Sequence, residues 1–183
     1  MYLVRRTKVD KYKPIVVRYL KSIPQKERSA EQQQVLDYLK WHSISSFPYA
    51  FKKKYKLKNI TVYADSDKGM YYVLQDGKRL YFKQSMDKET ARAYAGGILC
   101  EQDENSPHRY ETADFHVEHG DVVADAGAAE GNFGLAVVER VKKLFLFEPE
   151  ADWIAPLEAT FAPWKDKVFI VNRCISSSYG GGG

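Results

Sequence analysis

One stretch decides the fold of the carboxyl-terminal part of the chain: Val122-Val123-Ala124-Asp125-Ala126-Gly127-Ala128-Ala129-Glu130-Gly131-Asn132-Phe133. A short apolar run ends in Asp125, two glycines four positions apart permit a tight turn, and apolar residues resume from Phe133. The pattern predicts a buried strand, a glycine-bearing turn and a helix. The start of such a helix leaves free N–H groups that face whatever lies on the turn.

Strand and helix patterns continue to alternate after this stretch. Apolar runs at 143–147 and 168–171 predict two further strands, with helices expected at 132–141 and 152–161. Continuous apolar strands alternating with helices are typical of a parallel sheet covered on both faces. We therefore expect an α/β fold whose parallel half-sheet occupies residues 105–175.

A different strand pattern precedes this half-sheet. Three β-branched or aromatic runs between residues 59 and 84, separated by turn residues, predict an antiparallel meander. A helix capped by Asp87 should run from Lys88 to Glu101, weakened by glycines in its second half. Together these elements define an expected α+β segment over residues 59–104. A proline in a first-turn position predicts one more short helix at 107–114.

The amino-terminal region is basic and helical. Residues 1–59 hold 15 Lys and Arg against 4 Asp and Glu, whereas residues 60–183 hold 13 against 20. Helices are expected at 14–22 and after the capping-box pattern that begins at Ser29. The positive charge suits nucleic acid, an anionic membrane surface or an acidic substrate, or it is simply a solvated face.

Aromatic residues are interleaved with lysines at 47–56. Single-stranded nucleic acid or an anionic glycan could use such a surface. A connector with packed aromatics and solvated lysines explains the pattern as well, and we expect the connector rather than nucleic-acid binding. The expected organisation is therefore a basic helical region over 1–58, the α+β segment, the half-sheet, and a flexible Gly- and Ser-rich tail over 176–183.

Cysteine usage and hydropathy constrain the class of protein. Cys100 and Cys174 lie far apart without metal-ligand spacing, so we expect reduced, mostly buried thiols and no metal site. The amino terminus has no apolar signal region, and no stretch approaches the ~18 apolar residues of a membrane span. A cytoplasmic protein without a membrane span is expected.

The candidate site lies beyond the carboxyl ends of the parallel strands, where open sheets bind ligands. Asp125 can fix the turn or orient a cation through water, and Glu148 can accept hydrogen bonds from both ribose hydroxyls. A dinucleotide motif would carry three glycines, whereas here an acid lies inside the motif and Glu130 would repel a pyrophosphate. A cationic sulfonium with an amino-acid head is the better electrostatic match, and NAD the weaker alternative.

The run 120–133, followed by Leu146-Phe147-Glu148-Pro149, resembles the first motif and the next acidic motif of class I S-adenosylmethionine-dependent methyltransferases. Within that class it most resembles the FkbM family, over about residues 105–175. The resemblance implies a Rossmann-like sheet, S-adenosylmethionine as cofactor, and methyl transfer to a hydroxyl of a small-molecule or glycan acceptor. The resemblance also implies that Gly127, Ala128 and Gly131 surround the methionine part of the cofactor. Glu148 would bind the ribose, and Asn172 would lie near the adenine. Arg109 or Tyr110 would reach the carboxylate of the cofactor or the substrate.

The sequence departs from the family after the third parallel strand. FkbM-like chains continue into a strand that carries residues near the transferred methyl, and this sequence has no such segment. We therefore expect a sheet truncated after its third strand, with weak or no activity, and we name no catalytic base. The alternative from another class is a non-enzymatic binding or assembly module that self-associates through the open edge of a half-sheet.

Overall fold

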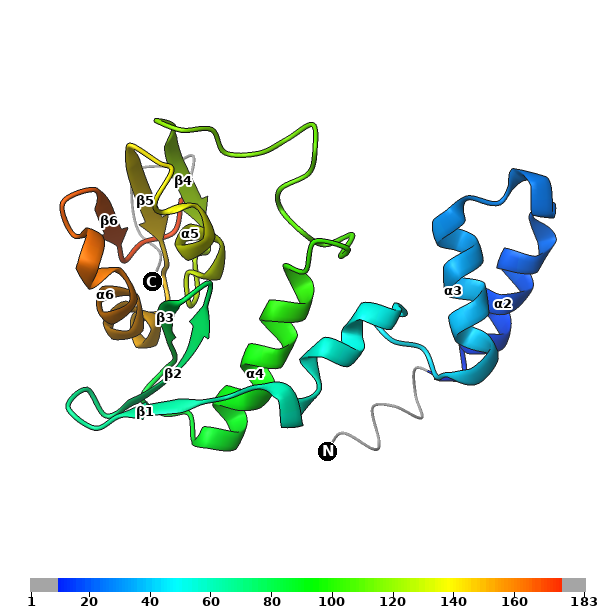
Figure 1. Ribbon diagram of the computed structural model, residues 1–183, viewed down its shortest axis with the longest axis horizontal. Coiled ribbons are helices and arrows are strands. Elements are labelled where there is room, and N and C mark those ends of the chain that lie inside the picture. Colours follow the sequence, from blue (N-terminus) through cyan, green and yellow to red (C-terminus); the bar gives the residue numbers. More distant parts are fainter. Residues whose placement is uncertain (1–9, 176–183) are drawn as a thin grey trace. The chain divides into compact units, whose positions relative to one another are not determined.

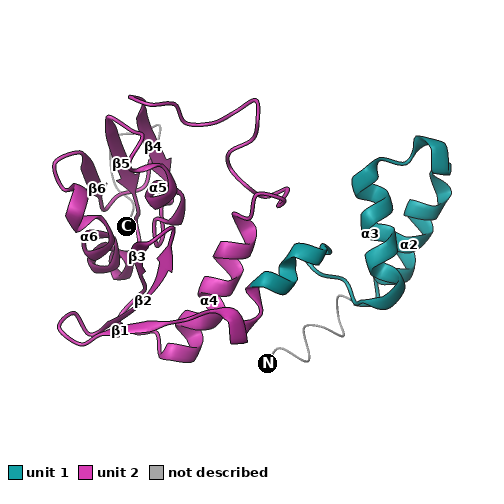
Figure 2. Ribbon diagram, viewed as in Figure 1, with its two compact units in different colours: residues 1–54 teal, residues 55–183 magenta. Residues whose placement is uncertain are grey.

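The computed structural model describes residues 10–175, and the chain divides into two compact units, residues 1–54 and 55–183 (Figure 2). In the first unit, helices α2 (Lys13–Ser22) and α3 (Ala30–Trp41) form a hairpin through the 3-10 turn Gln25–Glu27 (Figure 1). Leu20, Leu36 and Leu39 are buried between the two helices. These apolar contacts hold the hairpin together.

The capping box at the start of α3 is confirmed. The Ser29 hydroxyl accepts a hydrogen bond from the Gln32 backbone N–H at 3.1 Å, and the Gln32 side chain accepts one from the Ser29 N–H at 3.0 Å. Two otherwise unpaired groups of the helix start are thereby satisfied.

The aromatic and cationic stretch forms a 3-10 helix, Ala50–Tyr55, near the border of the two units. Within the first unit the Tyr49 hydroxyl donates to Glu31 at 2.6 Å, and the Tyr49 ring stacks on Phe51 at 5.4 Å. Within the second unit the Tyr55 hydroxyl donates to Asp103 at 2.7 Å. These contacts give the aromatic rings a packing role.

The second unit begins with the predicted antiparallel meander. Its strands are β1 (Tyr63–Asp65), β2 (Met70–Gln75) and β3 (Lys78–Tyr81), paired in that order. The first strand starts at Tyr63, later than its apolar residues suggest. Ile60 and Val62 instead pack into the core, so the residues before β1 follow the core surface rather than a neighbouring strand.

Helix α4 (Lys88–Glu101) follows, as predicted, with the Asp87 carboxylate accepting the Thr90 N–H at 2.7 Å. The helix continues through its glycines. A Cβ on Gly96 would lie 3.2 Å from the carbonyl oxygen of Tyr55, so a glycine permits the preceding segment to approach α4 closely. This close packing outweighs the low intrinsic helix propensity of glycine.

The carboxyl-terminal part forms the predicted parallel sheet. Strands β4 (Val122–Ala126), β5 (Lys143–Phe147) and β6 (Val168–Val171) pair in that order. The connections contain α5 (Asn132–Val137) and α6 (Ile154–Phe161), the latter preceded by the 3-10 turn Ala151–Trp153 and followed by Ala162–Trp164. Residues 10–175 thus form an α/β structure with one antiparallel and one parallel three-stranded sheet.

The expectation that both faces of the parallel sheet are covered is wrong for the residues that the structure describes. Leu144 and Leu146 are fully buried, and a Cβ on Gly134 of α5 would lie only 3.0 Å from the Leu146 side chain. The other face carries Val122, 61% exposed, and Phe169, 39% exposed. Burial along β4 alternates because helices pack on one side of it only.

The meander packs on the helices that cover the parallel sheet. The Tyr81 backbone N–H donates to the Thr160 hydroxyl of α6 at 3.0 Å, and the Gln75 amide donates to the Asn132 carbonyl of α5 at 2.7 Å. One continuous core contains residues of both sheets, among them Val73, Leu80, Phe82, Leu135, Leu146 and Leu157. The meander, α4 and the parallel sheet therefore belong to the same compact unit.

The predicted helix at 107–114 is wrong, because this segment forms turns and extended backbone (Figure 1). One guanidinium nitrogen of Arg140 donates to both carboxylate oxygens of Glu111, at 2.8 and 2.9 Å, and Glu111 also accepts the Val117 N–H at 2.8 Å. This ion pair binds the segment to the turn after α5. It also gives Arg140 a role outside the helix predicted at 132–141, and α5 ends at Val137.

Neither cysteine forms a disulfide. Cys100 is buried, but Cys174 is exposed, which corrects the expectation that both thiols are mostly buried. Within residues 10–175, no helix is both long and apolar enough to cross a membrane.

Candidate functional site

The glycine turn after β4 is a tight, left-handed structure. Gly127, Ala129 and Gly131 all have positive φ, at 78°, 47° and 81°. The N–H groups of Gly127 and Ala128 donate to the carbonyl of Phe147 at 2.8 and 3.1 Å, so the turn is attached to the end of β5. Ala129 is the strained member, because a side chain disfavours this backbone region.

Glu148 braces this turn. One carboxylate oxygen accepts the Ala129 N–H at 2.8 Å, and the other accepts the Glu150 N–H at 2.7 Å. The residue is only 5% exposed. The Asn172 amide donates to the carbonyls of Glu148 and Pro149 at 2.8 and 3.1 Å. The residues expected at the ribose and the adenine thus form one network that fixes the strand ends.

A cavity of about 190 Å³ opens beside the turn. It contains four of the sequence-predicted site residues, Tyr110, Asp125, Gly127 and Ala128, together with Tyr94, Ile98, Glu101, Ala129, Glu130, Asn132 and Phe133. Gly131, Glu148 and Asn172 are not in its lining. A Cβ on Gly131 would lie 2.7 Å from the ring of Phe161, so this glycine serves close packing with α6.

The cavity is acidic. Asp125, Glu130 and Glu101 face it, and its lining in the described part of the chain contains no Lys, Arg or His. Burial, and then the charge of Glu148, raise the pKa of Asp125 to about 6. Burial also raises the pKa of Glu130, opposed by a hydrogen bond from the Tyr94 hydroxyl at 2.6 Å. A cluster of buried and partly buried carboxylates favours a cationic ligand, because the ligand would neutralise charges that now oppose one another.

Helix α4 supplies the cavity wall that the sequence reasoning missed. The Tyr94 ring packs against Phe82 at 5.8 Å and Trp153 at 5.6 Å, which holds its hydroxyl on Glu130. Tyr94, Ile98 and Glu101 recur at positions i, i+4 and i+7. That spacing places them on one helix face and was the available signal.

The two residues expected to close over a cofactor lie in different places. Tyr110 reaches the cavity, where its ring meets Phe133 edge to face at 5.3 Å. Arg109 instead lines a separate hollow of about 360 Å³ with residues that include Glu111 and His116. The structure therefore brings Tyr110, but not Arg109, to the candidate site.

Comparisons with protein-family models, curated proteins and solved structures found no match to this chain. Among residues 10–175, no group of three or more His, Cys, Asp or Glu side chains is arranged to hold a metal ion.

Proposed function

We propose that the second unit binds S-adenosylmethionine and is the cofactor-binding part of a Rossmann-like, FkbM-type O-methyltransferase. One observation carries this proposal: an acidic and aromatic cavity adjoins the glycine turn at the carboxyl end of β4. This is the edge where open parallel sheets bind ligands. Gly127 and Ala128, which the family resemblance assigns to the cofactor, line it together with Asp125 of the same motif.

The charges of the cavity fit this cofactor. S-adenosylmethionine carries a sulfonium, an ammonium and a carboxylate group and is a net cation, and the carboxylates of Asp125 and Glu130 would neutralise its two cationic groups. The rings of Tyr94 and Tyr110 suit a cation as well, since aromatic faces attract positive charge. A dinucleotide pyrophosphate would be repelled by the same carboxylates.

The size of the cavity limits what it holds. Its volume of about 190 Å³ lies below the roughly 300–1,000 Å³ of small-molecule sites. The cavity suits the methionine end of the cofactor, while the ribose lies toward Glu148. Because Glu148 is buried and holds two N–H groups, ribose binding requires the turn to open. The cofactor would supply the electrophilic methyl, and the residues named here would bind and orient it.

Thermal unfolding with S-adenosylmethionine, S-adenosylhomocysteine or NAD tests the proposal. Ligand at about 100 times Kd stabilises the fold by about 2.7 kcal/mol. We expect S-adenosylmethionine to raise Tm more than S-adenosylhomocysteine, which lacks the sulfonium charge, with no rise from NAD. Asp125→Asn should abolish most of the difference, whereas Asp166→Asn, on the exposed surface, should not. No rise with S-adenosylmethionine, or an equal rise with NAD, would contradict the assignment.

A second candidate function is self-assembly through the parallel sheet. The exposed Val122 and Phe169 lie on the uncovered face, where Phe169 stacks on Phe145 at 5.0 Å. In the described part of the chain, β4 and β6 are also edge strands. An apolar face beside unpaired edges favours association with another sheet.

A further inference from the structure

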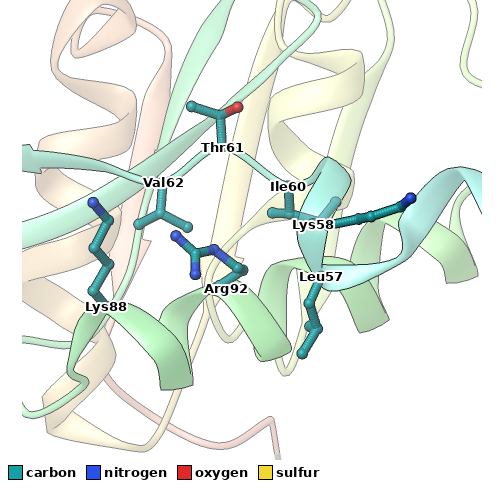
Figure 3. A pocket seen from close by; sticks show the side chains of 7 residues that line it. All are labelled: Leu57, Lys58, Ile60, Thr61, Val62, Lys88 and Arg92. Atoms are coloured by element: carbon teal, nitrogen blue, oxygen red, sulfur yellow. The ribbon is translucent and has the colours of Figure 1, made fainter.

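A second hollow lies on another side of α4. It has a volume of about 410 Å³ and is lined by Leu57, Lys58, Ile60, Thr61, Val62, Lys88 and Arg92 (Figure 3). On α4, the residues Lys88 and Arg92 lie at positions i and i+4, away from the face that carries Tyr94 and Glu101. The same helix therefore borders an acidic cavity on one side and a basic hollow on the other.

Two cations of the hollow extend in the same direction. Figure 3 shows the side chains of Lys88 and Arg92 rising from α4 toward residues 60–62, whereas Lys58 extends away from them. Lys88 has no ion-pair partner among the residues that the structure describes. Arg92 pairs with Glu89 at 2.6 Å, but the Glu89 side chain is 71% exposed. Such an exposed pair is weak, so Arg92 can exchange this partner for a bound anion.

The carboxylate of Asp87, next to Lys88 in the chain, already accepts a backbone hydrogen bond. Asp87 caps α4 by accepting the Thr90 N–H. Hydrogen bonding to Thr90 lowers the pKa of Asp87, and burial opposes this shift. Neither Asp87 nor Glu89 belongs to the lining of the hollow. The hollow therefore presents a guanidinium and an ammonium without a carboxylate among its lining residues.

Apolar side chains complete the lining. Leu57, Ile60 and Val62 come from the segment before β1, whereas the Thr61 side chain extends away from Lys88 and Arg92 (Figure 3). A guanidinium binds phosphate oxygens through its planar fork, and an ammonium adds a compact point charge. Apolar groups beside these charges would contact the organic part of a ligand.

We propose that this hollow is a binding site for a phosphate monoester with a compact apolar body. Arg92 and Lys88 bind the phosphate, and Leu57, Ile60 and Val62 contact the organic part. The site is independent of the cofactor proposal, because it shares no lining residue with the acidic cavity.

Gly96 gives the hollow its shape. An added Cβ would lie 3.2 Å from the Tyr55 carbonyl oxygen, 3.7 Å from Ile60 and 4.0 Å from Leu57. A methyl group there would push the apolar wall away from α4 while leaving both cations in place. Gly96→Ala therefore tests the wall separately from the charges.

The experiment is an NMR titration of the full chain with phenyl phosphate, inorganic phosphate and benzoate at constant ionic strength. We expect saturable amide shifts in residues 57–62 and 88–92, with phenyl phosphate binding tightest. The double variant Lys88→Gln/Arg92→Gln should raise its Kd at least about tenfold, since each charged hydrogen bond contributes on that scale. Lys58→Gln, and Lys142→Gln elsewhere on the surface, should change it less than about twofold.

A dispersed spectrum of the double variant would show that its fold is intact, and Gly96→Ala should weaken phenyl phosphate binding with both cations retained. The proposal is overturned if the amide shifts with phenyl phosphate grow without saturation, or if the double variant still binds phenyl phosphate as the parent does. It is also overturned if benzoate binds as tightly as phenyl phosphate, or if phenyl phosphate binds no more tightly than inorganic phosphate. Binding of S-adenosylmethionine should be the same in the double variant and the parent chain, so failure of one site is distinguishable from failure of the other.

Discussion

Asp125 connects the cavity to the stability of the fold. Its pKa is raised from 3.8 to about 6 by burial and then by the charge of Glu148. Because the folded state has the higher pKa, protonation of Asp125 favours the folded state. This contribution to the free energy of unfolding is complete below pH 3.8 and is lost as pH rises through about 6. Asp125→Asn should therefore stabilise the protein at pH 8 by up to about 3 kcal/mol. Denaturant unfolding at pH 8 and pH 4 measures this gain, which should fall below about 1 kcal/mol at the lower pH.

The same substitution distinguishes a functional acid from a structural one. If Asp125 serves cation binding, Asp125→Asn should be more stable at pH 8 and yet bind S-adenosylmethionine more weakly. Asp166→Asn provides the control for loss of one surface carboxylate. A variant that loses both stability and binding at pH 8 would contradict the assigned role, because it would show that the charge supports the fold.

Gly131 fixes the distance between the turn and α6. Its φ of 81° disfavours a side chain, and an added Cβ would lie 2.7 Å from Phe161 and 2.8 Å from Leu157. We expect Gly131→Ala to lower the free energy of unfolding by about 2–4 kcal/mol, from backbone strain and overpacking together. Gly120→Ala is the matched control, since Gly120 has a φ of 93° but no atom within 4 Å of the added Cβ. Denaturant unfolding of both variants should show the smaller loss for Gly120→Ala.

At the level of elements, the contact between β3 and α6 includes one buried side-chain hydrogen bond. Thr160 accepts the Tyr81 N–H at 3.0 Å. Thr160→Val keeps the shape but leaves this N–H unpaired, which should cost about 1–3 kcal/mol. Thr160→Ser should retain the bond and lose less. Amide exchange at Tyr81 should accelerate in the valine variant, and an unchanged rate would show that the bond contributes little.

The elements that the sequence predicted correctly have local causes. The capping box at Ser29, the Asp87 cap and the apolar periodicity of β5 and β6 all depend on residues close together in the chain. The helix expected at 107–114 failed because its Glu111 pairs with Arg140, and no local pattern reports a partner 29 positions away.

The candidate site shows the same division. Its half on the glycine turn, including Asp125 and Gly127, followed from the rule that ligands bind at the carboxyl ends of parallel strands. Its other half, Tyr94 and Glu101, comes from α4, which the packing of the meander brings to the same cavity. The bracing by Glu148 was equally hidden, because a carboxylate at a strand end gives no sign of which N–H groups it will accept.

At the level of the whole molecule, the second unit contains three structural layers: the meander with α4, the helices α5 and α6, and the parallel sheet. The face of the parallel sheet that carries Val122 and Phe169 is exposed. Covering this face would bury apolar surface, which favours association.

Phe169 is the residue to test on that face. If the face mediates self-association, Phe169→Ser should raise the dimer dissociation constant at least about tenfold, because an aromatic side chain would be lost from the contact. Leu74→Ser is the matched control, since Leu74 is an exposed apolar residue on the other sheet. Sedimentation velocity over a range of concentrations measures the effect. A parent chain that stays monomeric at high concentration would rule out this role.

Helix α4 also has a consequence for how two ligands would influence each other. It is one continuous rod, with Tyr94 and Glu101 bordering one cavity and Lys88 and Arg92 bordering the other. A ligand that displaces the rod from one side alters the opposite side at the same time. Thermodynamic reciprocity then requires the two ligands to change each other's affinity by the same factor.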